Sequence, residues 1–365
     1  MSIRLCDLII AQEKSKIKAG EGKTKGDYKF FTSSNIQTKY VDFFQYDKPA
    51  LIFGTGGMPS IHYCDEPFST STDCIVFYAK NNRYSLKSLY LFFESHMNLL
   101  EEGFHGAGLQ HISKKYLLDI QIPDIPIEQQ LKINNIGDKL NRLIDIRKNQ
   151  LENYNSIVKS RFIEMFGSYP INPKGWNIGK IRDIVKDVRY GSSRPAVVGG
   201  KYPYLRMNNI TYDGKLDLTD IKYIDVPESE LDKCAVRKGD VLFNRTNSRE
   251  LVGKTCVYTN NEIMVLAGFI IRIRVNELVL PEFLSSFLNT DFSKQKLFNM
   301  CKTAIGQANI NAQELQNIGI YLPPIKLQQE FVQFKKQVDK SKLAIEKSIE
   351  KLEILKKSLM QEYFG

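Results

Sequence analysis

The sequence predicts an α+β fold in which two globular domains, small twisted β-sheets with helices, are separated by two long antiparallel coiled-coil helices. Three observations lead to this pseudo-two-fold internal repeat. A stretch of the chain occurs twice, each copy ends in a long helical pattern, and the two remaining stretches share short matching segments. With 365 residues, the chain is long enough for two domains.

The internal repeat aligns residues 108–167 with residues 306–365 at a constant shift of 198 positions, without a gap. Fourteen of the sixty aligned positions carry the same residue, whereas chance would give about four. The identical residues in the first copy are Gly108, Ile112, Leu117, Ile120, Ile122, Pro126, Ile127, Gln130, Glu152, Lys159, Ser160, Glu164, Phe166 and Gly167. A repeat of this length indicates a fold made of two halves with one plan.

Each copy of the repeat ends in a pattern that is typical of a long helix. In the second copy, Phe331, Val338 and Ile345 recur at heptad spacing, and no Pro or Gly interrupts the chain between Pro324 and Gly365. The pattern predicts helices over 128–167 and 326–365, each about 57 Å long. Because neither helix can bury its apolar stripe alone, we expect them to pair antiparallel, and the ungapped repeat disfavours two unrelated surface helices.

The globular stretches, 1–127 and 168–325, are more diverged copies of one another. Lys180-Ile181-Arg182-Asp183-Ile184 parallels Arg4-Leu5-Cys6-Asp7-Leu8, and Lys238–Phe243 parallels Lys48–Phe53. Aromatic and β-branched segments predict strands, and one apolar pattern predicts a helix; these segments are 28–32, 50–53, 74–78 and 204–207 for strands and 86–100 for the helix. The loops between them differ in length, which fits one scaffold adapted to two targets.

A glycine-rich segment, Gly54-Thr55-Gly56-Gly57-Met58-Pro59-Ser60, superficially resembles the cofactor loop of a methyltransferase. It lacks the strand–loop–helix context of such loops, because Pro59 and the aromatic strand after it prevent a helix. We therefore expect a tight turn between two strands.

Composition favours an acidic partner. The net charge is +10 and the pI is about 9.1, so nucleic acid is the first expectation and a membrane surface the second. The six cysteines match no zinc spacing and are expected to be reduced thiols of a cytoplasmic protein. We expect no membrane span and no signal peptide, because no segment approaches about 18 apolar residues.

No catalytic motif in the sequence is convincing, so the chain is not expected to be an enzyme. The four histidines lack metal-ligand spacing. Pro123-Asp124 with Glu128 faintly resembles a nuclease carboxylate pair, but its lysine is missing and acidic residues at a helix entry commonly act as caps.

Polar loops that follow the predicted strands are the candidate DNA-binding residues. Arginine can pair with guanine and asparagine with adenine in the major groove, while lysines between glycines suit phosphate contact. For each residue alone, turn chemistry, a helix cap or a solvated loop explains its presence equally well, so the prediction depends on the set. The candidates are Lys23, Lys25, Ser33, Asn35 and Thr55 in the first half, and Ser192, Arg194, Arg206, Asn208, Asn244, Arg245, Thr246, Asn247 and Arg249 in the second.

Over nearly its whole length the chain resembles the specificity subunit of type I restriction–modification systems. One set of matching segments is Gly306-Gln307-Ala308-Asn309-Ile310-Asn311, then Ile318–Pro324, then Gln328-Gln329 leading into the last helix. The other set is Gly239-Asp240-Val241-Leu242-Phe243-Asn244-Arg245-Thr246 with Val252-Gly253-Lys254. The order of these segments, duplicated in one chain, carries the likeness.

The resemblance implies target recognition domains over 1–127 and 168–325 and conserved spacer helices over 128–167 and 326–365. Each domain would recognise one half of a bipartite site in double-stranded DNA. The helices would set the spacer and bind methyltransferase subunits, two per chain, that methylate adenine. The resemblance assigns this chain no cofactor: S-adenosylmethionine, ATP and magnesium would belong to the methyltransferase and restriction/translocase subunits.

One departure from the family concerns the first domain, which is shorter and matches the family's loops less well. Two other functions stay open at this point. The chain could be a coiled-coil scaffold that binds no DNA, or the DNA-recognition part of a split methyltransferase–nuclease.

Overall fold

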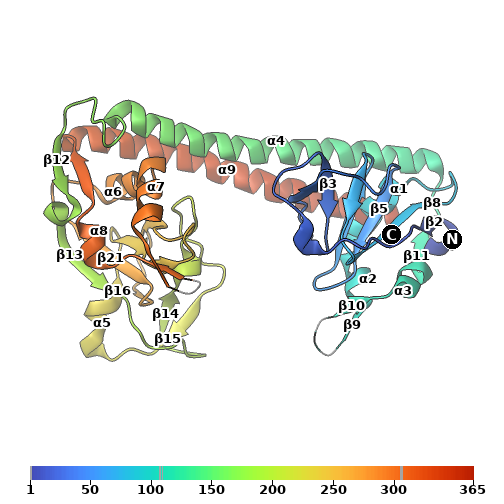
Figure 1. The fold of residues 1–365 in the computed structure, drawn as a ribbon, viewed down its shortest axis with the longest axis horizontal. Helices are drawn as coiled ribbons and strands as arrows, with labels where there is room; N and C mark the ends of the chain where they lie inside the picture. The colour runs from blue at the N-terminus through green and yellow to red at the C-terminus, as the bar shows by residue number, and fades with distance from the viewer. Residues whose placement is uncertain (1, 107, 109, 305–306) are drawn as a thin grey trace. The chain divides into compact units, whose positions relative to one another are not determined.

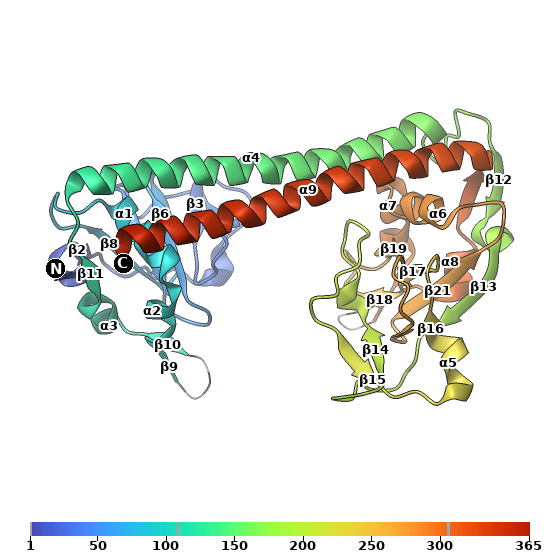
Figure 2. The ribbon, with the colours of Figure 1, turned by 180° about the vertical axis from the view of Figure 1, so that it is seen from behind.

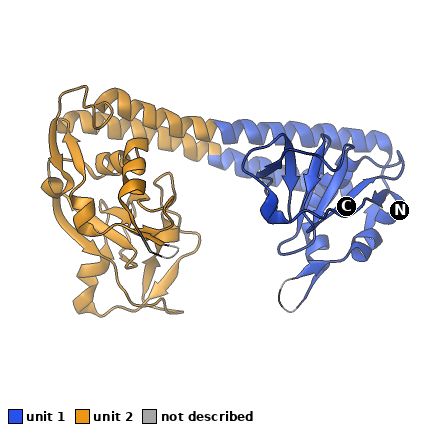
Figure 3. Ribbon diagram, in the orientation of Figure 1, with its two compact units in different colours: residues 1–149, 346–365 blue, residues 150–345 orange. Residues whose placement is uncertain are grey.

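The computed structural model describes residues 2–106, 108, 110–304 and 307–365. Gly306, the first residue of the second repeat copy, lies outside the described residues. The chain forms two compact units (Figure 3): unit 1 comprises 1–149 and 346–365, and unit 2 comprises 150–345. Each unit is described by itself below, with the elements labelled as in Figure 1.

The two long helices are α4, Ile127–Phe166, and α9, Ile325–Phe364, each of 40 residues. Each helix begins in one unit and ends in the other. The proline before each helix cannot donate a ladder hydrogen bond but is tolerated at a helix start, which explains why both begin directly after Pro126 and Pro324. Gly167, with φ +82°, ends α4 in a left-handed conformation that favours glycine.

In unit 1 the start of α4 packs against the end of α9. The ammonium group of Lys132 lies 6.0 Å from the ring centroid of Tyr363. Ile133 belongs to the same apolar core as Met360 and Phe364. Figures 1 and 2 both place the end of α9 beside the sheet and helices of this unit.

In unit 2 the end of α4 packs against the start of α9. The rings of Phe162 and Phe331 lie 5.2 Å apart, and Arg161 lies over the ring of Phe334. The buried ammonium of Lys342 donates to the side-chain oxygen of Asn155. The antiparallel pairing predicted from the heptad pattern is therefore present within each unit.

Unit 1 is built on a four-stranded antiparallel sheet of order β2-β8-β5-β6 and a three-stranded sheet of order β4-β3-β7. Short pairs β1·β11 and β9·β10 complete it. Its strands are β1 Ser2–Arg4, β2 Ile9–Ala11, β3 Tyr28–Phe31, β4 Lys39–Val41, β5 Ala50–Gly54, β6 Ser60–Cys64, β7 Phe68–Thr70, β8 Cys74–Ala79, β9 Phe104–His105, β10 His111–Ile112 and β11 Gln121–Pro123. Its helices besides α4 and α9 are η1 Leu5–Asp7, η2 Ala19–Glu21, α1 Leu86–Ser95, α2 Met97–Glu101 and α3 Lys114–Asp119.

Unit 2 repeats this plan with four-stranded sheets of order β13-β21-β17-β19 and β15-β14-β20-β16, a three-stranded sheet β18-β23-β22 and the pair β12·β24. Its strands are β12 Asn177–Lys180, β13 Val185–Tyr190, β14 Tyr202–Leu205, β15 Lys222–Ile224, β16 Ala235–Val236, β17 Val241–Asn244, β18 Thr246–Asn247, β19 Thr255–Val257, β20 Met264–Leu266, β21 Ile270–Val275, β22 Lys302–Ala304, β23 Gln307–Asn309 and β24 Gly319–Leu322. Its other helices are η3 Ile181–Ile184, η4 Met207–Asn209, α5 Glu228–Cys234, α6 Pro281–Leu288, α7 Asp291–Met300 and α8 Ala312–Gln316.

A backbone hydrogen bond that recurs at equivalent positions shows that the two units are copies. Leu5 N–H donates to Ile120 at 2.9 Å, and Ile181 N–H donates to Ile318 at 2.9 Å. The β4-β3-β7 sheet of unit 1 and the β15-β14-β20-β16 sheet of unit 2 each contain one parallel pair, β3·β7 and β14·β20. The predicted fold class, α+β with an internal repeat and long paired helices, is confirmed.

The repeat also explains one buried polar residue in each unit. Gln130 and Gln328, identical in the two copies, are both 0% exposed. Gln130 accepts from Ser85 N–H at 2.8 Å and donates to two backbone carbonyls, and Gln328 does the same with Leu280 N–H at 2.9 Å and two carbonyls. Each glutamine thus fastens its long helix to the chain segment before α1 or α6.

Two expectations about single elements need correction, and a third is confirmed. The predicted helix over 86–100 is divided into α1 and α2, because His96 leaves helical geometry with φ −122° and ψ 47°. The predicted strand over 204–207 ends at Leu205, and η4 follows. The glycine-rich segment is a turn between β5 and β6, as expected, with Gly57 at φ +83°.

Candidate nucleic-acid interface

In unit 2 the loop after β17 contains the largest group of predicted DNA-binding residues. Asn244 ends the strand and is completely buried, and its amide donates to the carbonyl oxygens of Thr246 at 3.0 Å and Phe269 at 3.2 Å. Asn247 in turn donates to the Asn244 side chain at 2.9 Å. Asn244 and Thr246 are both buried, and the hydrogen bonds of Asn244 help to shape the loop.

Arg245 lies between these two buried residues and is only half-buried. Its guanidinium lies 4.9 Å from the ring centroid of Tyr190, at the end of β13. Nη2 donates to the side-chain oxygen of Asn309 at 3.0 Å and Nη1 to the Gly268 carbonyl at 3.4 Å. Three separate strands or loops therefore fix the direction of one arginine side chain.

Arg249 ends the same loop in a similar way. Its guanidinium lies 4.2 Å from the ring centroid of Phe298 on α7, and Nε donates to the Phe298 carbonyl at 3.1 Å. Among the described residues, neither Arg245 nor Arg249 forms an ion pair with a carboxylate. Both arginines are exposed or half-buried cations with free charge, which suits contact with nucleic acid.

Ser192 binds the same glycine that Arg245 contacts: the Ser192 carbonyl accepts a hydrogen bond from Gly268 N–H at 2.7 Å. Arg194 follows, but its guanidinium binds both carboxylate oxygens of Glu230, at 2.9 and 3.2 Å. Its charge is thus paired in this structure.

The segment after β14 holds the other two candidates of unit 2. Arg206 binds the carboxylate and carbonyl of Asp220 at 2.7 and 3.1 Å, whereas Asn208 is exposed. Next to Asn208, the Met207 carbonyl accepts from the Lys254 ammonium at 2.8 Å. The buried Lys254 therefore connects the segment after β14 with the segment that follows β17.

Lys254 and Lys294 are functional candidates that sequence reasoning missed. Burial, together with the nearby charges of Lys254 and Lys159, lowers the pKa of Lys294 to about 8. Its ammonium donates to the Gly253 carbonyl at 2.9 Å and lies 5.2 Å from the Tyr212 ring centroid. Lysine alone gives no signal of burial in a sequence, and only the fold brings these two cations together.

Unit 1 places its candidates in a less basic setting. Ser33 and Thr55 both donate their hydroxyls to the Asp73 carbonyl, at 2.9 and 3.0 Å, so the structure brings these two together. Asn35 is exposed on the same loop as Ser33. Lys23 pairs with Asp42, and Lys25 is exposed two residues further on; among the described residues, no hydrogen bond or ion pair joins either lysine to Ser33 or Thr55.

Matching hydrogen bonds identify equivalent positions in the two units. Thr55 corresponds to Arg245, since the Thr55 carbonyl accepts from Ile112 N–H and the Arg245 carbonyl from Ile310 N–H. The constant shift of the repeat then pairs His111 with Asn309. The side chains at these positions differ although the backbone around them is the same.

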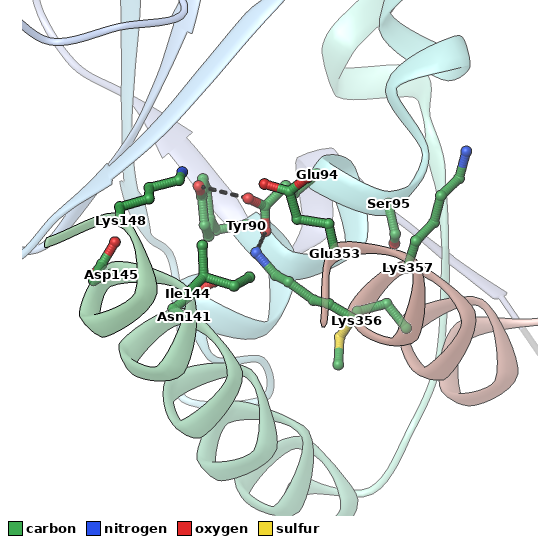
Figure 4. Close-up of a pocket in the computed structure, with 11 residues that line it drawn as sticks. Tyr90, Glu94, Ser95, Asn141, Ile144, Asp145, Lys148, Glu353, Lys356 and Lys357 are labelled. Atoms are coloured by element: carbon green, nitrogen blue, oxygen red, sulfur yellow. Dashed lines mark hydrogen bonds and ion pairs between the residues drawn. The ribbon is translucent and has the colours of Figure 1, made fainter. Parts of the chain in front are cut away.

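A pocket of about 440 Å³ lies in unit 1 between α1 and the two long helices (Figure 4). Lys356 on α9 forms an ion pair with Glu94 on α1 at 2.5 Å, and Tyr90 donates to Glu94 at 3.2 Å. Lys148 and Lys357 also line the pocket. None of the predicted DNA-binding residues lies in it.

Comparison with known proteins agrees with this duplicated architecture. Residues 1–154 and 173–356 match the type I restriction modification DNA specificity domain, and the chain belongs to that family. Within the described ranges, no helix has both the length and the apolar composition needed to cross a bilayer.

Two curated relatives are specificity subunits. The chain is 28% identical over 198 residues to the putative type I restriction enzyme MjaX specificity subunit of Methanocaldococcus jannaschii, covering 53% of this chain and 46% of that protein. It is 26% identical over 260 residues to the type I restriction enzyme EcoKI specificity subunit of Escherichia coli, covering 67% of this chain and 56% of that protein. The chain thus spans about half the length of these two relatives.

Two solved structures share the fold. One is the S subunit of a type I restriction–modification system from M. genitalium, with a TM-score of 0.51, 15% identity and coverage of 100% of this chain and 96% of that one. The other comes from a study of complex assembly and conformational transition of the type I system, with a TM-score of 0.58, 17% identity and coverage of 100% and 97%.

Proposed function

We propose that this chain is the DNA sequence-recognition subunit of a type I restriction–modification complex and has no catalytic activity of its own. Unit 1 would recognise one half of a bipartite site in double-stranded DNA, and unit 2 the other half. The target recognition domains would span 1–127 and 168–325, with the spacer helices between and after them.

This proposal depends on one observation: the two units repeat the same backbone arrangement but carry different side chains in their loops. Equivalent hydrogen bonds hold Thr55 and Arg245, yet one is a neutral hydroxyl and the other a cation stacked on an aromatic ring. Direct recognition depends on side-chain donors and acceptors at base edges, so the two units would favour different bases.

The long helices are proposed to bind methyltransferase subunits, two per chain, and to set the unread spacer. Support comes from large apolar side chains that the helices leave exposed. In unit 1 these include Leu131, 59% exposed, and Ile354, 61% exposed, and in unit 2 they include Leu343, 51% exposed. Large apolar side chains that stay exposed on a helix favour a protein partner.

The partner subunits are proposed to supply S-adenosylmethionine for adenine methylation, and ATP and magnesium for restriction. No cofactor is proposed for this chain. The complex is proposed to act in the cytoplasm.

A binding assay at two salt concentrations tests the proposal against the alternative of a scaffold that binds no DNA. The purified full chain is titrated with a duplex of mixed sequence at 50 and 200 mM salt, and the affinity is expected to fall with a slope of about −0.9 per phosphate neutralised. Absence of salt-dependent binding would favour the scaffold.

A further inference from the structure

We propose that Arg245 recognises a guanine in the second half-site and that Tyr190 and Asn309 are the residues that position it. This inference rests on the proposed function of unit 2. It specifies the base that unit 2 recognises and the two side chains that position the arginine for that contact.

The arginine is held before any DNA arrives. Its backbone is fixed on both sides, with N–H donating to the Phe269 carbonyl at 2.9 Å and the carbonyl accepting from Ile310 N–H at 2.9 Å. Tyr190 supports the flat face of the guanidinium, and the Tyr190 hydroxyl itself accepts from Ala312 N–H at 2.9 Å. A side chain that is already ordered loses less entropy on binding.

The donors that remain on the guanidinium fit guanine. Nε is buried and has no hydrogen-bond partner among the described residues. Nη1 gives one N–H to Gly268 and Nη2 gives one to Asn309, so each keeps one further N–H. An arginine that offers two N–H groups can bind both O6 and N7 of guanine in the major groove.

Charge separates Arg245 from other arginines of unit 2. Arg194, Arg206 and Arg274 each bind a carboxylate, on Glu230, Asp220 and Asp240. Such pairs compete with a base for the guanidinium donors. Arg245 has neutral partners only among the described residues, so its charge is available to DNA.

Unit 1 offers an internal contrast. Thr55 at the equivalent position gives its hydroxyl to the Asp73 carbonyl at 3.0 Å, and His111 stands where unit 2 has Asn309. A threonine cannot form the paired contact with guanine. The first half-site is therefore not expected to require guanine at the equivalent position.

The test is selection by the full chain from a duplex DNA library with a randomised core, followed by sequencing. The wild-type chain is expected to enrich a motif with an invariant guanine in one half. For Arg245→Lys, which keeps the charge but loses the paired geometry, preference for that guanine is expected to fall about 5- to 150-fold. The salt dependence of binding should stay unchanged.

Asn309→Ala examines the positioning role. It is expected to weaken preference at the same base only, without altering the other half-site or the salt dependence, a pattern that a general loss of stability would not produce. Arg237→Ala is the matched control: this exposed arginine of unit 2 pairs with Asp232 at 2.8 Å, and its loss should leave the motif unchanged.

The outcomes separate the two proposals. If both variants retain the wild-type motif at every position, the guanine assignment is wrong while DNA recognition stands. If the wild-type chain enriches no motif, the proposed function fails and the assignment fails with it.

Discussion

Unit 1 and unit 2 differ most where their sheets carry charge. In β8 of unit 1, Val76 pairs in register with Ile52, whereas in β21 of unit 2 the equivalent Arg272 pairs with Leu242. Arg272 is 2% exposed and binds the carboxylate of Asp187 at 2.6 Å. One topology is therefore stabilised by apolar packing in the first copy and by a buried ion pair in the second.

The side chains within the sheets and loops therefore differ between the two units. The residues that attach the long helices to each unit are the same in both. Gln130 and Gln328 make equivalent hydrogen bonds in both units. A duplicated protein whose two copies need the same helix attachment but different targets would be expected to diverge in this way.

The largest effect is expected for Arg272→Met. Removing Arg272 takes from Asp187 one of its two arginine partners and leaves the Asp232 and Ala235 carbonyls without that donor, which costs about 3–5 kcal/mol. Hydrogen exchange measured over the full chain should show faster exchange in unit 2 only.

The double variant Arg272→Met with Asp187→Ile makes the pair apolar, as in unit 1. It should recover part of the lost stability, because no carboxylate that has lost its Arg272 donor stays behind. Equal destabilisation of unit 1 and unit 2 would contradict the assignment of the ion pair to unit 2 alone.

Gln130→Ala and Gln328→Ala test the feature that the two units share. Each removes the same set of buried hydrogen bonds, so each is expected to cost about 1–3 kcal/mol per backbone group left unpaired. Exchange should rise at the Ser85 amide in the first variant and at the Leu280 amide in the second. Gln333→Ala, at an exposed position of α9, is the control, and a large effect in only one unit would argue against equivalent anchors.

Acid should weaken unit 2 more than unit 1. Burial alone would raise the pKa of Asp187, but hydrogen bonds from Arg272 and Arg189 outweigh it and hold that pKa below its usual value. A carboxyl with a lowered pKa stabilises the fold above its unfolded pKa, and this contribution is lost as the pH falls below about 4. Residue-resolved exchange between pH 5 and pH 3 checks this, with Asp187→Asn expected to reduce the difference.

The smallest effect is expected for Lys23→Ala in unit 1. Lys23 and Asp42 form a surface ion pair with side chains that are 62% and 56% exposed. Such pairs contribute about 0–1 kcal/mol, so thermal unfolding should be nearly unchanged. A large loss would show that the lysine-rich loop is part of the fold of unit 1.

Much of the fold was predictable because the helices carry a strict heptad pattern and the repeat is ungapped. The start of α4 after Pro126 and the turn at Gly57 follow from local chemistry. The break at His96 was not predictable, because apolar residues continue on both sides of it and the backbone departure has no sequence signal.

The candidate interface was predictable only in part. Arg245 was identified from its place after a buried strand, but the same pattern included Asn244, which is buried, and Arg194, which is paired with Glu230. Tyr190 and Asn309 were missed because they come from distant segments that only the folded sheet brings to Arg245. Residue type predicts a capacity for hydrogen bonding, while exposure and partners come from tertiary structure.

The most direct test of the central claim, that one duplicated scaffold carries two unlike recognition surfaces, is a map of methylated adenines in source cells with and without this chain. The account predicts a chain-dependent motif with two different half-sites separated by an unread spacer of constant length. A continuous motif, two identical half-sites, or a map that does not change when the chain is removed would contradict it.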